Sequence, residues 1–147
     1  MAGEFNAVEV GDCFTTSGRT ITEADVVNFA GVSGDFNHLH TNAERMADSG
    51  YGERIAHGAL VFSVVTGLLW QARDEAEKRH MVAFYGIDRL RFIKPVFLGE
   101  TVHVEAEIVD KERRDHPVAT GVVRTEVTAL NQADEAVFSA EFLTLRR

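Results

Sequence analysis

The sequence predicts an α+β protein in which a curved antiparallel sheet wraps around one long central helix. Residues 20–80 carry helical patterns, whereas residues 82–147 carry strand patterns. The segment after Gly58 is apolar on all sides for about three turns, which is typical of a helix that other structure surrounds. Segments of the second half alternate apolar and polar residues, which indicates a sheet with one face turned toward this helix.

The first predicted helix begins beside Thr22. Asp25 follows three residues later, as in a capping pair, and an apolar face at helical spacing continues to Ser33. Gly34 ends this helix and, because glycine tolerates unusual backbone angles, allows a sharp bend after it. We expect the segment that follows, residues 35–40, to be irregular.

Two short segments lead to the central helix. Residues 42–47 are expected to form one or two helical turns, and residues 49–54 to form a loop. The central helix then runs from Gly58 to about Lys78, and its apolar part of about 12 residues is too short to span a bilayer. Its last turns are charged and should emerge into solvent with Arg73, Asp74, Glu75, Glu77 and Lys78.

The strands of the sheet are predicted from apolar alternation and from turn residues. Val102 and Val104 face one way while His103 and Glu105 face the other, as in a half-buried strand. Pro95 ends the strand before it. We expect strands over residues 83–93, 102–108, 118–130 and 136–145, a hairpin turn over residues 131–134 and an edge strand over residues 10–15.

Length, charge and cysteine content narrow the possible functions. A chain of 147 residues is expected to form one domain, residues 1–147, with a core large enough to fold without disulfides or structural metal ions. The net charge of −8 argues against non-specific binding to nucleic acid or to anionic membranes, because both need a positive field. Cys13 is the only cysteine, which fits a reducing compartment. The N-terminus shows no signal-peptide pattern, so we expect a cytoplasmic protein.

The residues that can carry chemistry lie on both sides of the loop before the central helix. The run FAGVSGDFNHLH places the carboxylate of Asp35 five residues before the imidazole of His40, with Asn37 between them. A carboxylate and an imidazole within reach of one water can divide the roles of base and acid. Gly58 opens the central helix, and its backbone N–H is one of the unpaired donors that stabilise developing negative charge.

The run SGDFN-x-LH, followed by HG and an apolar helix, resembles the MaoC-like, or hydratase 2, family of (R)-specific enoyl-CoA hydratases. The resemblance extends over most of the chain and includes ITEADVVNFAGVSGD, IAHGAL and LRFIKPVFLGETV. It implies the hotdog fold, which agrees with the elements above, and a homodimer with the acyl-CoA tunnel near the subunit interface. His38 stands where the family usually has proline, and this departure bears on rate and substrate more than on reaction type.

The resemblance also implies a mechanism that needs no metal or redox cofactor, with coenzyme A present only as part of the substrate. Asp35, the expected base, and His40 would hold one water against the double bond of a trans-2-enoyl-CoA and yield an (R)-3-hydroxyacyl-CoA. Asn37 would orient the water or the dyad, the name used here for Asp35 together with His40. The N–H of Gly58 would bind the thioester oxygen as enolate charge develops.

Further residues are expected along the substrate by the same resemblance. Thr66 and Leu69 would line the acyl pocket and limit chain length, although core packing explains them equally well. His57 and Ala59 would lie beside the substrate at the helix start, where His57 could instead bond a backbone group. Candidate partners of the CoA phosphates, or else members of an ordinary solvated strand face, are Arg54, Arg89, Arg91 and Lys94.

Several alternatives stay open on the sequence alone. The substrate could be a branched or dicarboxylic hydroxyacyl-CoA of methylmalyl or mesaconyl type, or the protein could bind acyl-CoA without turnover. A hotdog thioesterase is disfavoured because the central helix holds no carboxylate between Gly58 and Asp74. Asp35 could merely cap a turn. A metal site is a further alternative that the resemblance makes unnecessary; its ligands would be Asp35, His38, His40 and His57.

Overall fold

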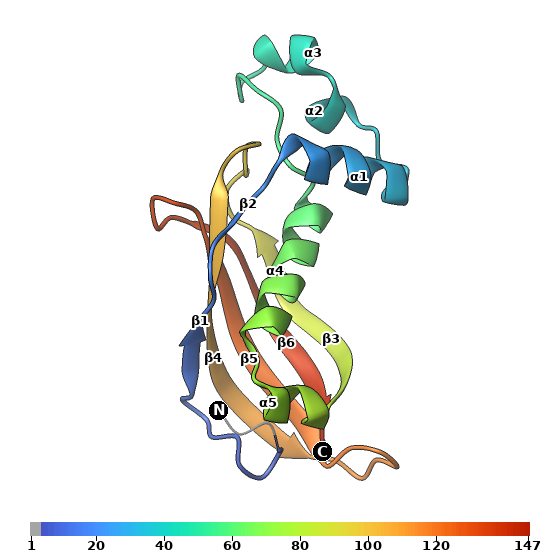
Figure 1. The fold of residues 1–147 in the computed structure, drawn as a ribbon, viewed down its shortest axis with the longest axis vertical. Helices are drawn as coiled ribbons and strands as arrows, with labels where there is room; N and C mark the ends of the chain where they lie inside the picture. Colours follow the sequence, from blue (N-terminus) through green and yellow to red (C-terminus); the bar gives the residue numbers. More distant parts are fainter. Residues whose placement is uncertain (1–3) are drawn as a thin grey trace.

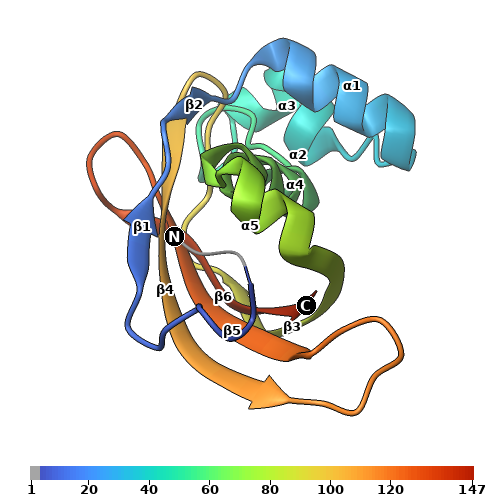
Figure 2. The same ribbon diagram turned by 60° about the horizontal axis from the view of Figure 1, so that its bottom comes forward.

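A curved antiparallel sheet wraps around the central helix α4 (Gly58–Ala72) in this computed structural model (Figures 1 and 2). This arrangement confirms the predicted α+β hotdog fold. The structure describes residues 4–147, so the first three residues of the predicted domain lie outside the described part. Helices α1, α2 and α3 gather at the N-terminal end of α4, whereas α5 lies at its other end (Figure 1).

The sheet has the strand order β1-β4-β5-β6-β3, and β2 pairs separately with β4. The four predicted long strands are confirmed, the predicted edge strand is confirmed only from Cys13 onward because the residues just before it form a turn, and β2 was not predicted. The strand expected from residue 118 begins only at Gly121, because the N–H of Arg114 bonds the carbonyl of Thr120 and closes a loop there. The strands are β1 (Cys13–Thr15), β2 (Arg19–Thr20), β3 (Met81–Phe92), β4 (Thr101–Arg113), β5 (Gly121–Leu130) and β6 (Ala136–Arg146).

Helix α1 (Glu23–Ser33) begins as predicted, with a capping box at its first turn. The N–H of Asp25 donates to Oγ1 of Thr22 at 3.1 Å, and the N–H of Thr22 donates to Oδ2 of Asp25 at 2.9 Å. Two short helices follow, α2 (His38–Thr41) and α3 (Ala43–Ala47). The prediction that residues 35–40 are irregular is therefore wrong from His38 onward, because the side chain of Asn37 caps α2.

The central helix is shorter than the sequence predicted. It ends at Ala72, and a separate helix α5 (Glu75–His80) follows, so the expected single helix to Lys78 is wrong. Asp74 has an extended backbone and forms a capping box with Glu77, which starts the new helix. Glu77 also does not emerge into solvent, since it is only 3% exposed.

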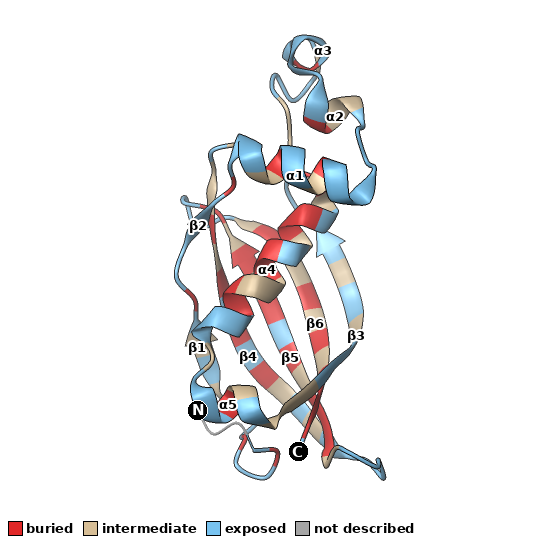
Figure 3. Ribbon diagram, turned by 45° about the vertical axis from the view of Figure 1, so that its right-hand side comes forward, coloured by how far each residue is buried: buried red, intermediate tan, exposed pale blue. Residues whose placement is uncertain are grey.

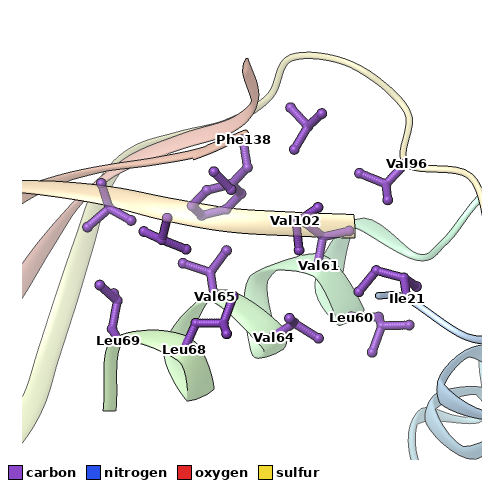
Figure 4. Packing of buried hydrophobic residues seen from close by; sticks show 14 of the residues in the cluster. Ile21, Leu60, Val61, Val64, Val65, Leu68, Leu69, Val96, Val102 and Phe138 are labelled. Carbon is purple, nitrogen blue, oxygen red and sulfur yellow. The ribbon is translucent and has the colours of Figure 1, made fainter. Parts of the chain in front are cut away.

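The core lies between α4 and the concave face of the sheet. Burial of one such leucine or valine side chain contributes about 1.5 to 3 kcal/mol to folding. The opposite side of α4 is less covered, with Ala59, Ser63 and Trp70 exposed (Figure 3). The expectation that other structure surrounds this helix on all sides is therefore wrong for the single chain. Figure 4 shows the buried side chains of α4, which are Leu60, Val61, Val64, Val65, Leu68 and Leu69, facing Val102 and Phe138 of the sheet.

Within residues 4–147, none of the helices has both the length and the apolar character that crossing a bilayer requires.

Candidate active site

Asp35 lies in the short loop between α1 and α2, directly after a left-handed bend. Gly34 takes a φ of 76°, a region that favours glycine, and thereby lets α1 end and the chain turn. The carboxylate Oδ1 of Asp35 accepts a hydrogen bond from the backbone N–H of Asn37 at 3.2 Å. The side chain is 49% exposed, so its second oxygen, Oδ2, is free to meet a ligand.

His40 lies on α2 and is only 7% exposed. Its Nδ1 is 2.7 Å from the carbonyl oxygen of Ile55, and because a carbonyl only accepts, Nδ1 carries the hydrogen. The neutral ring then has its lone pair on Nε2, which faces Oδ2 of Asp35 at 3.9 Å. Burial lowers the pKa of His40, and the rings of His57 and His38 add to this, against the opposing effects of Ile55 and Asp35. The ring is therefore a proton acceptor at neutral pH.

His57 contacts both Asp35 and His40. It precedes α4, is only 2% exposed, and its Nε2 is 2.9 Å from the carbonyl oxygen of Asp35. Its ring stacks on that of His40 with 3.7 Å between centroids and 28° between planes. Phe29 of α1 also packs against this ring in an edge-to-face arrangement, with 5.0 Å between the ring centroids. The end of α1, helix α2 and the start of α4 thus meet at one imidazole.

A cavity of about 440 Å³ opens beside His40, which lines it, whereas Asp35 is not among its lining residues. Gly58, the first residue of α4, lines it together with His40, and amides in the first turn of a helix have no intrahelical acceptor. A Cβ at this position would lie 2.9 Å from the ring of Phe92, so a larger residue would force the ring or the helix start to move. The cavity therefore combines a proton-accepting imidazole with the positive end of a helix. Its other walls include Leu39, Tyr51, Ile55, Phe92, Ile93 and Lys94.

This arrangement can move protons around one bound water. A gap of 3.9 Å between Oδ2 of Asp35 and Nε2 of His40 is too long for a direct hydrogen bond but suits a shared water that donates to both. Asp35, His40 and His57 also bring possible metal-ligating atoms within 4.8 Å of one another. Nε2 of His57 is already bonded to the carbonyl of Asp35 and its Nδ1 is buried, so the geometry suits a water between Asp35 and His40 better than an ion shared by all three.

Comparison with known proteins identifies the family. The family model of the MaoC like domain matches residues 6–131, which is most of the chain. The chain belongs to the MaoC-like domain family. This is a family of hydratases and dehydratases, so the class of chemistry is that of a hydro-lyase.

The most similar MaoC-like proteins include an enzyme of nearly the same length. The (R)-specific enoyl-CoA hydratase of Aeromonas caviae is 35% identical over 133 residues, which cover 89% of this chain and 94% of that protein. Protein MaoC of Klebsiella aerogenes is 42% identical over 100 residues, or 68% of this chain, but the chain spans only 29% of that protein's length. A solved Archaeoglobus structure, described as a monoamine oxidase regulatory protein, is similar with a TM-score of 0.90 at 34% identity and covers 99% of this chain and 95% of that chain.

Backbone hydrogen bonds hold part of the MaoC-like motif around Asp35 in place. Asn37 bonds the Asp35 carboxylate with its N–H, while its side chain accepts from the N–H of Leu39 at 3.0 Å and caps the helix that carries His40. His38 occupies the first position of α2. Proline is favoured at such a position because the N–H that proline lacks would have no acceptor within the helix. Histidine in place of the family's proline therefore breaks no helical hydrogen bond. Ala59 is exposed and does not line the cavity.

The residues expected along the acyl chain lie elsewhere in the single chain. Thr66 and Leu69 line a second cavity of about 420 Å³, whose walls include Trp70 and Phe84. This cavity lies toward the far end of α4, a helix whose 15 residues span about 22 Å. Leu69 also belongs to the buried core, so this residue both lines a cavity and contributes to core packing.

The basic residues expected at the CoA phosphates are not gathered in one place. Of the four, only Lys94 lines the cavity beside His40, and it already pairs with Glu135. Arg91 donates to the carbonyl oxygen of Leu90 and does not line the cavity. Arg54 pairs with Glu23 at 2.8 Å, and Arg89 pairs with Glu141 at 2.6 Å.

Sequence reasoning missed two features of this site. Tyr51 lines the cavity from a segment predicted only as a loop, and no local pattern distinguishes it. The interpretation that His57 bonds a backbone group is confirmed at the carbonyl of Asp35, but the stacking of its ring on His40 was missed, because stacking depends on where α2 meets α4. The dipeptide His57-Gly58 at a helix start was the available signal.

Proposed function

We propose that this protein adds water to trans-2-enoyl-CoA to give (R)-3-hydroxyacyl-CoA, or catalyses the reverse dehydration. The observation that carries the proposal is the meeting of Asp35, His40 and the start of α4. Oδ2 of Asp35 lies 3.9 Å from Nε2 of His40, and His40 lines one cavity with Gly58. The carbonyl of Asp35 bonds His57, the residue directly before Gly58. The 35% identity to a hydratase of nearly the same length supports this reaction.

In the proposed step one water is held between the two acceptors. Its oxygen forms a bond to C3 of the enoyl thioester while one O–H bond breaks, and the dyad takes that proton. The π electrons of the double bond move to C2 and the thioester oxygen, where the N–H of Gly58 stabilises the enolate. The dyad then returns its proton to C2 on the same face. The expectation that Asp35, rather than His40, accepts the first proton stays a prediction.

This chemistry requires no redox change, because the water supplies both the hydroxyl group and the hydrogen that are added. The thioester supplies the electron sink, and coenzyme A is part of the substrate. The proposal therefore needs no further cofactor.

We also propose that the protein acts as a homodimer paired through β3. Within residues 4–147 this strand of 12 residues pairs with β6 alone, so its other edge is open. Phe84, Tyr85 and Phe92 are 46%, 55% and 53% exposed along it, and a long open apolar edge is normally covered. Two copies related by a twofold axis would pair their β3 strands antiparallel.

Such pairing would bring the two cavities together. The cavity with Thr66 and Leu69 includes Phe84 near the start of β3, whereas the cavity with His40 includes Phe92 at its end. Antiparallel pairing would place the start of one strand beside the end of the other, so an acyl chain could run from one dyad toward the partner's second cavity. Tyr85→Lys should give a monomer by light scattering, and an unchanged dimer would overturn pairing through β3.

The reaction is tested by following the loss of enoyl-thioester absorbance with crotonyl-CoA, with the product trapped by an (R)-specific or an (S)-specific hydroxyacyl-CoA dehydrogenase. Turnover to the (R) product is the expected result. Turnover only with branched or dicarboxylic enoyl-CoA would move the assignment to a dehydratase of that class. Binding of acyl-CoA without turnover across the whole panel would overturn the enzyme assignment.

A further inference from the structure

His57 contacts both members of the dyad, and neither contact is required by the proposed reaction steps. We propose that His57 is a positioning residue: its Nε2–H fixes the backbone of Asp35, and its ring supports the ring of His40. One buried side chain would thereby set the separation between the two acceptors. The kinetic part of this inference rests on the proposed function, whereas the structural part can be measured without turnover.

The first contact ties the Asp35 loop to the central helix. The Asp35 carbonyl accepts at 2.9 Å from a ring 22 residues later in the chain. The other hydrogen bonds of Asp35 join it to near neighbours in the chain, Ser33 at the end of α1 and Asn37 in the same exposed loop. The bond from His57 therefore anchors this loop to a buried element, and its loss would let the carboxylate move relative to His40.

The hydrogen-bonding state of His57 follows from its partners. Because a carbonyl only accepts, the hydrogen lies on Nε2, and Nδ1 carries the lone pair. Nδ1 is buried and has no hydrogen-bond partner among the described residues, so the bond to Asp35 is the hydrogen bond that holds this ring.

The second contact shields His40 from water. The centroids of the two rings lie 3.7 Å apart, and Phe29 packs against His57 with 5.0 Å between centroids. Removal of the His57 ring would let water reach His40 and would raise its lowered pKa toward the ordinary value. The titratable groups that face His40 are Asp35, His38, His57 and, across the cavity, Tyr51 and Lys94.

Two substitutions separate the two contacts. His57→Phe keeps an aromatic ring beside His40 but cannot donate to Asp35, whereas His57→Gln keeps an amide donor of similar reach but has no ring. His103→Gln is the control, because His103 lies on β4 with Asp134 as its neighbour at 3.8 Å. Circular dichroism and melting of each variant establish that it folds.

Two readouts are measured on each protein: kcat for crotonyl-CoA and the titration of the His40 ring followed by NMR. For His57→Phe we expect kcat to fall about 10- to 100-fold, as for a catalytic group displaced by about 1 Å, with KM and the His40 midpoint little changed. For His57→Gln we expect a smaller loss of kcat and an upward shift of the His40 midpoint, which also moves the acid limb of the pH–rate profile. His103→Gln should change neither readout.

Wild-type kcat in His57→Phe, together with a wild-type His40 midpoint in folded His57→Gln, would overturn the inference. An inactive wild-type protein would refute the proposed function but would leave the NMR measurement intact. In that case an unshifted His40 midpoint in His57→Gln overturns the positioning role, and a raised midpoint supports it.

Discussion

Gly58→Ala tests whether the start of α4 takes part in the reaction. The added Cβ would lie 2.9 Å from Cε2 and Cζ of Phe92 and 3.0 Å from Cε1. Carbon atoms in ordinary contact are separated by about 3.5 to 4.0 Å, so the ring or the helix start must move by about 0.6 Å or more. Phe92 is 53% exposed and can take up part of this shift. The rest of the shift moves the Gly58 N–H away from the place where it would donate to the thioester oxygen.

A displaced donor should act mainly on the transition state. We expect kcat/KM for crotonyl-CoA to fall about 100-fold, at the lower end of the loss seen when one oxyanion donor is removed. The assay is the initial rate of hydration by loss of enoyl-thioester absorbance. The melting temperature should change little, because an exposed ring rather than backbone lies against the new methyl group.

The double variant provides the control for this reasoning. Gly58→Ala combined with Phe92→Ala removes the ring that the new Cβ meets, so it should recover most of the activity lost in Gly58→Ala relative to Phe92→Ala alone. Full activity in Gly58→Ala, or a double variant as impaired as Gly58→Ala while both fold, would refute the account of this position.

Two further predictions concern stability. Glu77→Gln should lower the free energy of unfolding by about 3 to 5 kcal/mol, because the buried carboxylate lies near Arg73 and Arg146, and burial lowers the pKa of Arg146 to about 10. The exposed Glu75→Gln should cost less than about 1 kcal/mol, and equal urea midpoints for the two variants would contradict this. Burial also lowers the pKa of His40 from its ordinary 6.5, so between the folded pKa and 6.5 the unfolded chain binds the proton that the folded chain does not. The melting temperature should therefore fall as pH drops below 6.5, and less steeply in His40→Gln; parallel curves would refute this contribution.

The fold could be predicted because local pattern and overall architecture agree in this chain. Alternation in β4 and the capping pair of Thr22 and Asp25 each specify their element from neighbouring residues alone. The division of the central helix was missed although Asp74 and Glu77 have the same three-residue spacing as Thr22 and Asp25. The helical pattern continues through Asp74, so the spacing alone did not outweigh it; the extended backbone of Asp74 and its reciprocal bonds with Glu77 show that a new helix starts there.

The candidate site also has features that local sequence patterns predict and features that they do not. Asp35, His40 and Gly58 could be proposed because their spacing is carried by the sequence itself. The stacking of His57 on His40 depends on how α2 lies against α4, which no local pattern encodes. Thr66 could not be placed either, since its cavity lies at the other end of α4 and would join the dyad only through a second copy.

The central claim is that Asp35 and His40 act together on one water. Its most direct test is kcat/KM for crotonyl-CoA hydration by Asp35→Asn and His40→Gln, with acyl-CoA binding and oligomeric state measured on the same samples. We predict that each variant binds the thioester, keeps its fold and loses at least about 1,000-fold in kcat/KM. Near-wild-type turnover in either folded variant would contradict the claim.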